Sequence, residues 1–114
     1  HLNRWKQYAY EYLGKTQYIK NKIFILFNKW HKRYEYRRYL ENKLGVDKTD
    51  EGFDYVPAKG HASSFDKTKY QDDGSKMDVL NRWKSMKKNK LFKNILKDEE
   101  LKMLSSDIFD FSIG

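Results

Sequence analysis

Apolar residues recur at helical spacing in several stretches of this 114-residue chain. The first stretch runs from Leu2 to Leu13, where large apolar residues return every three or four positions, and Gly14 follows it. Glycine readily adopts the left-handed conformation that ends helices, and asparagine is a common helix cap. The pattern therefore predicts a helix over about residues 3–13, capped by Asn3.

The longest apolar stripe lies between Thr16 and Gly45. At 100° per residue its large apolar side chains fall on one side of a helix. Threonine is a good cap at the start and glycine a good stop at the end. We therefore expect a single helix over about residues 17–44. The residues of this stripe are Ile19, Ile23, Leu26, Phe27, Trp30, Tyr34 and Leu44.

Two further apolar stretches follow in the last third of the chain. Their phase shifts near Lys88–Lys90, which predicts separate helices over about residues 79–88 and 91–104. A cluster of three carboxylates begins at Asp98. Negative charge is favourable at the start of a helical turn, so we expect this cluster to stabilise one or to face solvent.

Residues 45–77 predict irregular structure, because they hold four of the six glycines and the only proline. They also carry seven carboxylates against five lysines, which makes them a candidate partner for the basic helix before them. The predicted fold class is all-α. We expect a compact bundle of three to five helices in a single domain over residues 1–114, with a long irregular loop at about 45–77.

The charge of the chain is strongly positive and unevenly distributed. The sequence has 24 Lys+Arg against 16 Asp+Glu, a net charge of +8, and 17% of its residues are aromatic. Residues 1–46 alone hold eleven basic and three acidic residues. Such a basic excess attracts nucleic acid, anionic lipid, acidic proteins or acidic and sulfated glycoproteins, and salt weakens the attraction.

The predicted 17–44 helix combines cations and aromatics outside its apolar stripe. Its far side would show tyrosine, isoleucine and lysine to solvent, where a surface helix normally shows polar residues. Either this helix is central and packed on two sides, or the far side is a binding face. The flanks of the stripe carry Lys22, Lys29, Arg33 and Arg38, and the far side carries Tyr18, Ile25, Lys32, Tyr36 and Tyr39.

Catalytic motifs are absent from the sequence. The chain has no cysteine, no nucleophile elbow and no glycine-rich phosphate loop, and its three histidines lack metal-ligand spacing. Only the stretch over residues 60–64, with a histidine beside two serines, offers groups for catalysis. The sequence predicts a non-enzymatic protein with no catalytic, cofactor-binding or metal-ligating residues and no cofactor.

One five-residue segment occurs twice, at residues 2–6 and 80–84, both reading Leu-Asn-Arg-Trp-Lys. It indicates tryptophan anchors in amphipathic helices, or a helical ligand read by a groove-forming partner such as a centrin-like acidic protein. Basic residues among aromatics would equally suit an intracellular nucleic-acid or ribonucleoprotein accessory protein.

Three segments resemble the gastropod sperm lysin family of small, basic, acrosomal proteins. They are Leu2-Asn3-Arg4, the run from Lys22 to Lys29, and the run from Phe92 to Asp98. The resemblance implies a secreted or acrosomal helical bundle that acts without catalysis. Family lysins bind egg-coat glycoproteins and disrupt the fibres stoichiometrically, and related acrosomal proteins act on membranes in gamete fusion.

The resemblance also implies partners, a localisation and roles for particular residues. An egg-coat glycoprotein is the first expected partner. An anionic membrane and a second copy of the chain are alternatives, and nucleic acid ranks below them. Secretion is the expected localisation, with an intracellular protein as the alternative. The implied basic tracks are Lys22, Lys29, Lys32, Arg33, Arg37 and Arg38, and the implied apolar contact residues are Tyr18, Ile25, Tyr36 and Tyr39.

Overall fold

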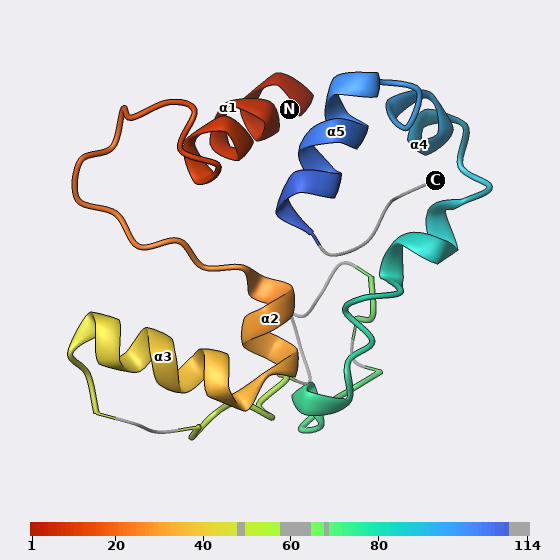
Figure 1. The fold of residues 1–114 in the computed structure, drawn as a ribbon. Helices are drawn as coiled ribbons and strands as arrows, with labels where there is room; N and C mark the ends of the chain where they lie inside the picture. Colours follow the sequence, from red (N-terminus) through yellow and green to blue (C-terminus); the bar gives the residue numbers. More distant parts are fainter. Residues whose placement is uncertain (48–49, 58–64, 68, 110–114) are drawn as a thin grey trace. The chain divides into compact units, whose positions relative to one another are not determined.

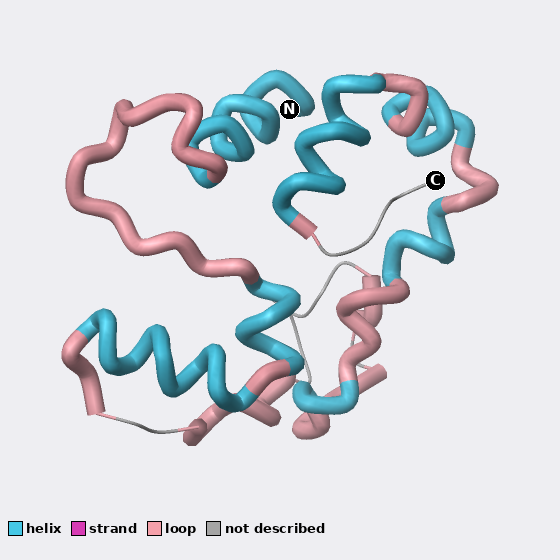
Figure 2. The backbone as a smooth tube through the Cα atoms, viewed as in Figure 1, coloured by secondary structure: helices cyan, strands magenta, loops and turns pink. Residues whose placement is uncertain are grey.

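The computed structural model describes residues 1–47, 50–57, 65–67 and 69–109, and it is helical (Figure 1). Within those residues there is no strand, which confirms the predicted all-α class (Figure 2). The elements in chain order are α1 (Leu2–Tyr12), α2 (Phe27–Lys32), α3 (Tyr34–Leu44), the 3-10 helices η1 (Gly74–Lys76) and η2 (Arg82–Met86), α4 (Lys90–Ile95) and α5 (Glu99–Ile108).

The chain divides into two compact units. Unit 1 is discontinuous and contains residues 1–24 and 85–114, whereas unit 2 is the continuous segment 25–84 between them. The expectation of one domain over residues 1–114 stays a prediction.

Unit 1 is built on the packing of α1 against α5. Its core contains Ala9 of α1 with Leu101 and Leu104 of α5, and Leu104 is fully buried. At the edge of this core, the Lys6 ammonium lies 2.7 Å from the Asp98 carboxylate and 2.6 Å from that of Glu100. The two ends of the unit are therefore joined by apolar burial and by charge pairing.

The C-terminal helical region is two short helices, not the single helix predicted over 91–104. The Asn89 side chain accepts a hydrogen bond from Phe92 N at 3.0 Å and caps α4. The Asp98 side chain accepts from Leu101 N at 2.9 Å and caps α5, so the carboxylate cluster does begin a helical turn as expected. Each cap satisfies an amide that has no partner inside its helix, which favours a new helix start at each site.

The predicted helix over residues 17–44 is wrong. In unit 2 the chain forms α2 and α3 with Arg33 between them in an extended conformation, at φ −121° and ψ 111°. The predicted stop at Gly45 is confirmed, because Gly45 ends α3 in the left-handed region at φ +65°.

The first part of that predicted helix, residues 17–26, is not helical at all. Glu11 of α1 binds the backbone amides of Tyr18 and Ile19, which would otherwise donate within a helix. Ile19 and Ile23 consequently lie 47% and 43% exposed, although the predicted stripe placed them in the core. A carboxylate acting from a neighbouring element has overridden the local periodicity.

Unit 2 has a small core made from separated parts of its sequence, namely Leu26, Leu40, Val56 and Val79. The described residues between 45 and 77 contain only the short η1, in agreement with the predicted irregular segment. The helix predicted over 79–88 is wrong, since this stretch holds only the five-residue 3-10 helix η2. Buried His31 connects α2 to η1, because its Nε2 donates to the Gly74 carbonyl at 2.7 Å.

Candidate binding surfaces

The residues implied as basic tracks do not share one helix face. Lys22 belongs to unit 1, where its ammonium pairs with Glu11 at 2.5 Å, and the others belong to unit 2. In unit 2, Lys29 is half-buried and Arg33 is exposed. Lys32 donates to the Met77 carbonyl at 3.0 Å. The predicted tracks depended on a continuous 17–44 helix, which the structure does not form.

Arg37 and Arg38 are engaged within unit 2. The Arg37 Nε lies 3.2 Å and an Arg38 nitrogen 2.7 Å from the same oxygen of Asp50. The hydrogen bond from Arg37 is the main cause that lowers the pKa of Asp50 below its ordinary value. This confirms that the acidic 45–77 segment pairs with the preceding basic helix. Both arginines therefore form ion pairs inside unit 2.

The same two guanidinium groups also contact aromatic rings. Arg37 lies 4.4 Å from the ring centre of Phe53, and Arg38 lies 4.6 Å from that of Tyr34. Stacked and ion-paired arginines hold a structure together and leave less charge for a partner. We therefore assign both arginines a structural role in unit 2.

The implied apolar contact residues are also divided between the units. Tyr18 in unit 1 is exposed, as are Ile25 and Tyr39 in unit 2. Tyr36 is half-buried, its hydroxyl accepts a hydrogen bond from Leu26 N at 3.0 Å, and its ring stacks on Tyr39 at 6.2 Å. Tyr36 is therefore part of the α2–α3 packing.

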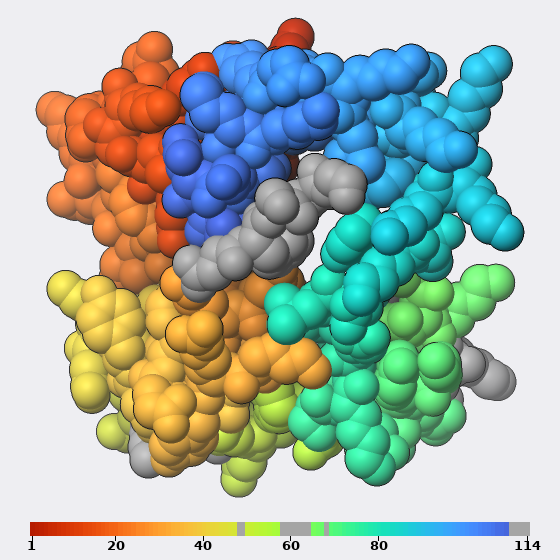
Figure 3. All heavy atoms as spheres, turned by 45° about the vertical axis from the view of Figure 1, so that its right-hand side comes forward, coloured from red at the N-terminus to blue at the C-terminus, as the bar shows by residue number. Residues whose placement is uncertain are grey.

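A lysine-rich surface in unit 1 was missed by the sequence analysis. The segment between Asp78 and Asp98 contains no carboxylate, and several side chains of its later part protrude from the face drawn in Figure 3. Within the described part of the chain, four exposed lysines among residues 85–97, the part of this segment that belongs to unit 1, have no ion-pair partner. We name them the lysine face: Lys88, Lys90, Lys93 and Lys97.

The helix α4 separates this charge from apolar surface. Lys90 and Lys93 are three residues apart and so lie on the same side of the helix. The other side contributes Phe92, Ile95 and Leu96 to an apolar cavity of about 300 Å³ shared with α1 and α5. The lysines are consequently held on a short helix whose opposite side is fixed in unit 1.

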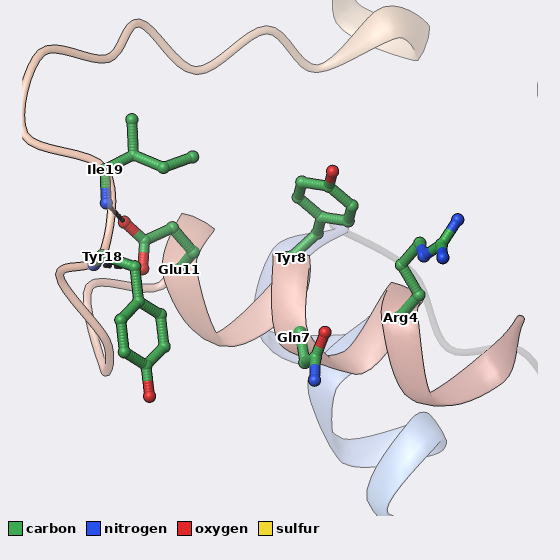
Figure 4. A pocket seen from close by; sticks show the side chains of 6 residues that line it. All are labelled: Arg4, Gln7, Tyr8, Glu11, Tyr18 and Ile19. Carbon is green, nitrogen blue, oxygen red and sulfur yellow. Dashed lines mark hydrogen bonds between the residues drawn. The ribbon is translucent and has the colours of Figure 1, made fainter.

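A second concave feature, the α1 pocket, lies between α1 and the segment that follows it (Figure 4). Its volume is about 260 Å³. One wall comes from α1 at helical spacing, and the other from two consecutive residues of the 17–26 segment. The lining residues are Arg4, Gln7, Tyr8, Glu11, Tyr18 and Ile19.

Glu11 holds the two walls of the α1 pocket together. Its carboxylate accepts hydrogen bonds from Ile19 N at 2.9 Å, Tyr18 N at 3.1 Å and Thr16 Oγ1 at 2.6 Å, in addition to the pair with Lys22. These donors, Lys22 foremost, lower the pKa of Glu11 to about 2. A carboxylate held so strongly in its charged form is a poor proton acceptor, so Glu11 builds the pocket and is not suited to general-base chemistry.

The described residues contain no group of three histidine, cysteine or acidic side chains that could hold a metal ion. The stretch over residues 60–64 lies outside the described residues. In the part of the chain that the structure covers, none of the helices combines the length and apolar character needed to cross a membrane. No protein-family model, curated protein or solved structure matches the chain.

Proposed function

We propose that this chain is a non-enzymatic binding protein that holds an acidic glycoprotein through the lysine face. The observation that carries the proposal is the set of four exposed lysines with no ion-pair partner among the described residues, on and beside α4. Because the net charge of the chain is also +8, long-range attraction would favour the encounter with a polyanion.

The composition of the lysine face favours sulfated or acidic glycans over nucleic acid. Single-stranded nucleic acids are normally held by exposed aromatic rings as well as by cations. The aromatic residue within this segment of unit 1, Phe92, instead lines the apolar cavity behind α4. Lysines act as point charges towards phosphate or sulfate and do not read bases by themselves.

The lysin resemblance makes an egg-coat glycoprotein the first natural partner to test. Binding would be stoichiometric, and apolar contact would have to add to charge. Leu91 lies next to the lysine face and is 69% exposed, so it offers such contact. Charge would then steer the encounter while apolar burial would contribute to its duration.

The test compares two variants of equal charge in binding to dextran sulfate, a sulfated polymer without carboxylates. One variant carries Lys88→Gln, Lys90→Gln, Lys93→Gln and Lys97→Gln. The control carries Lys43→Gln, Lys67→Gln, Lys69→Gln and Lys76→Gln, four exposed lysines of unit 2. At about 1 kcal/mol for each lysine at an anionic surface, the first variant should lose up to roughly three orders of magnitude in affinity.

Equal losses in the two variants would contradict the proposal, since they would show that net charge alone decides binding. A second comparison uses oligothymidylate and inorganic polyphosphate of matched charge. We expect equal affinity for both. Stacking adds about 1–3 kcal/mol per base, so a marked preference for oligothymidylate would indicate a nucleic-acid-binding protein.

A further inference from the structure

We propose that the α1 pocket binds one carboxylated sugar residue, a uronic or sialic acid, of the partner's glycan. This inference rests on the proposed function, because it names the part of the acidic glycoprotein that unit 1 would recognise. It concerns a separate surface, however, since no residue of the lysine face lines the pocket. Three properties of the pocket support it: its size, its charge and its pair of tyrosines.

The size of the pocket suits a ligand smaller than a drug molecule. Its volume of about 260 Å³ lies just under the roughly 300–1,000 Å³ of drug-sized sites. It is open to solvent, so a sugar can enter while remaining linked to a longer chain. A single ring with its substituents is therefore the appropriate class of occupant.

The charge of the pocket favours an anionic ligand. Arg4 supplies a planar guanidinium that can hold a carboxylate with two parallel hydrogen bonds, and within the described residues it has no ion-pair partner. Glu11 is the one carboxylate in the lining, but the ammonium of Lys22 neutralises it at 2.5 Å. Glu11 therefore does not cancel the attraction of Arg4 for an acid.

The remaining lining residues match a sugar ring. Tyr8 is 64% and Tyr18 is 85% exposed, so each ring is accessible to the C–H groups of a ligand. Tyrosine suits such half-wet sites because it has an apolar body and a polar hydroxyl. The Gln7 amide both donates and accepts hydrogen bonds, as ring hydroxyls require.

The pocket is held in shape before any ligand arrives. Glu11 binds the backbone amides of both Tyr18 and Ile19, which fixes the second wall against α1. Pre-organised walls reduce the conformational entropy that binding must remove. A small sugar can therefore bind measurably even though it buries little surface.

The experiment follows backbone amide NMR signals while glucuronic acid or N-acetylneuraminic acid is added to the full chain. Glucose serves as the neutral sugar and acetate as the carboxylate without a ring. We expect saturable shifts at α1 and at residues 18–19 for at least one of the two acids. Much weaker shifts are expected for glucose and acetate. Equal binding of acetate would show a plain anion site, and equal binding of glucose would show that charge is irrelevant; either result overturns the inference.

Arg4→Gln should weaken binding of the acidic sugar at least tenfold, which corresponds to the loss of one hydrogen bond to a charged group. Lys15→Gln removes the same charge from an exposed residue outside the pocket and should change the affinity less than twofold. Tyr18→Ala, on an exposed side chain that contributes little to folding, should weaken both acids and glucose together. Unchanged affinity in both Arg4→Gln and Tyr18→Ala would place the sugar elsewhere.

The two proposals fail separately. Arg4→Gln should leave dextran sulfate binding close to that of the Lys15→Gln control, because each variant removes a single charge outside the lysine face. The fourfold variant of the lysine face should bind the free acidic sugar normally. Loss of polymer binding with intact sugar binding therefore concerns the lysine face alone, and the reverse result concerns the α1 pocket alone.

Discussion

Replacing Gly74 by alanine should destabilise unit 2 more than any other single methyl group added to a described glycine. Gly74 is buried, and its backbone lies against the 53–54 segment. A Cβ atom at this position would meet the Phe53 carbonyl oxygen at 2.7 Å and the Asp54 Cα at 3.3 Å. Both are backbone atoms and cannot rotate away, so the two segments must separate.

The magnitude follows from the contacts that this separation breaks. Gly74 N donates to the Asp54 carbonyl at 3.0 Å, and the Gly74 carbonyl accepts from His31 Nε2 at 2.7 Å. The Nδ1 atom of His31 is buried and has no partner among the described residues, so the ring would lose its hydrogen bond. Overpacking costs roughly 1–3 kcal/mol, and an unsatisfied buried polar group costs about as much. We expect a loss of roughly 2–4 kcal/mol.

The assay is urea unfolding followed by tryptophan fluorescence, since Trp30 of unit 2 packs against Phe53 at 5.5 Å. Gly45→Ala is the matched control. Gly45 has φ +65° but no atom within 4 Å of an added Cβ, so alanine there should cost only about 1 kcal/mol of backbone strain. If Gly74→Ala is no more destabilising than this control, the close approach does not limit stability and the reasoning is refuted.

Two further predictions concern unit 1. Leu104→Ala should cost roughly 2–5 kcal/mol in urea unfolding, because Leu104 is 0% exposed and its removal leaves a cavity between α1 and α5; a cost under 1 kcal/mol would mean that the two helices re-pack freely. Glu11 should make the free energy of unfolding sensitive to acid. Its pKa falls from 4.5 to about 2 on folding. The charged carboxylate therefore contributes fully to stability above about pH 4.5, and this contribution is lost as the pH falls towards 2. The stability difference between the wild type and Glu11→Gln, measured by urea midpoints, should therefore be constant above pH 5 and shrink below it, whereas a difference unchanged down to pH 2 would contradict the assignment.

The helical class and several helix ends could be predicted from local sequence rules. Gly45 does end a helix in the left-handed region, and Asp98 does cap one. These signals work because a cap or a positive φ depends on only a few neighbouring residues. The opposite charges of adjacent segments predicted that the 45–77 segment pairs with the basic helix before it, and the contact of Asp50 with Arg37 is one such pair.

The helix breaks inside the predicted 17–44 helix could not be predicted from periodicity. The 17–44 stripe is regular, but Glu11 captures two backbone amides near its start and Arg33 adopts an extended conformation in its middle. Both effects depend on tertiary neighbours that a helical wheel does not contain. The basic tracks were predicted along this helix, and their role in binding a partner stays a prediction.

The two candidate surfaces differ in how far the sequence could have predicted them. The lysine face has a plain signal in the sequence, the absence of carboxylates between Asp78 and Asp98, although the larger basic excess lies in the first 46 residues. Only one wall of the α1 pocket could be predicted from the sequence. Arg4 and Tyr8 lie at helical spacing, but the second wall requires a non-helical segment at Tyr18 that was predicted to be helical.

The discontinuous make-up of unit 1 has a consequence for the order in which a ribosome delivers the chain. Residues 25–84 are continuous and can complete unit 2 as soon as they have left the exit tunnel. The Lys6 ammonium, by contrast, must wait for its partner Asp98, 92 residues later. At about 5–20 residues per second, this interval lasts roughly 5–20 s. During that time α1 has contacts within residues 1–24 to organise it, the Glu11 hydrogen bonds and the Tyr12–Phe24 ring contact among them, so the α1 pocket takes shape before the unit that contains it is closed.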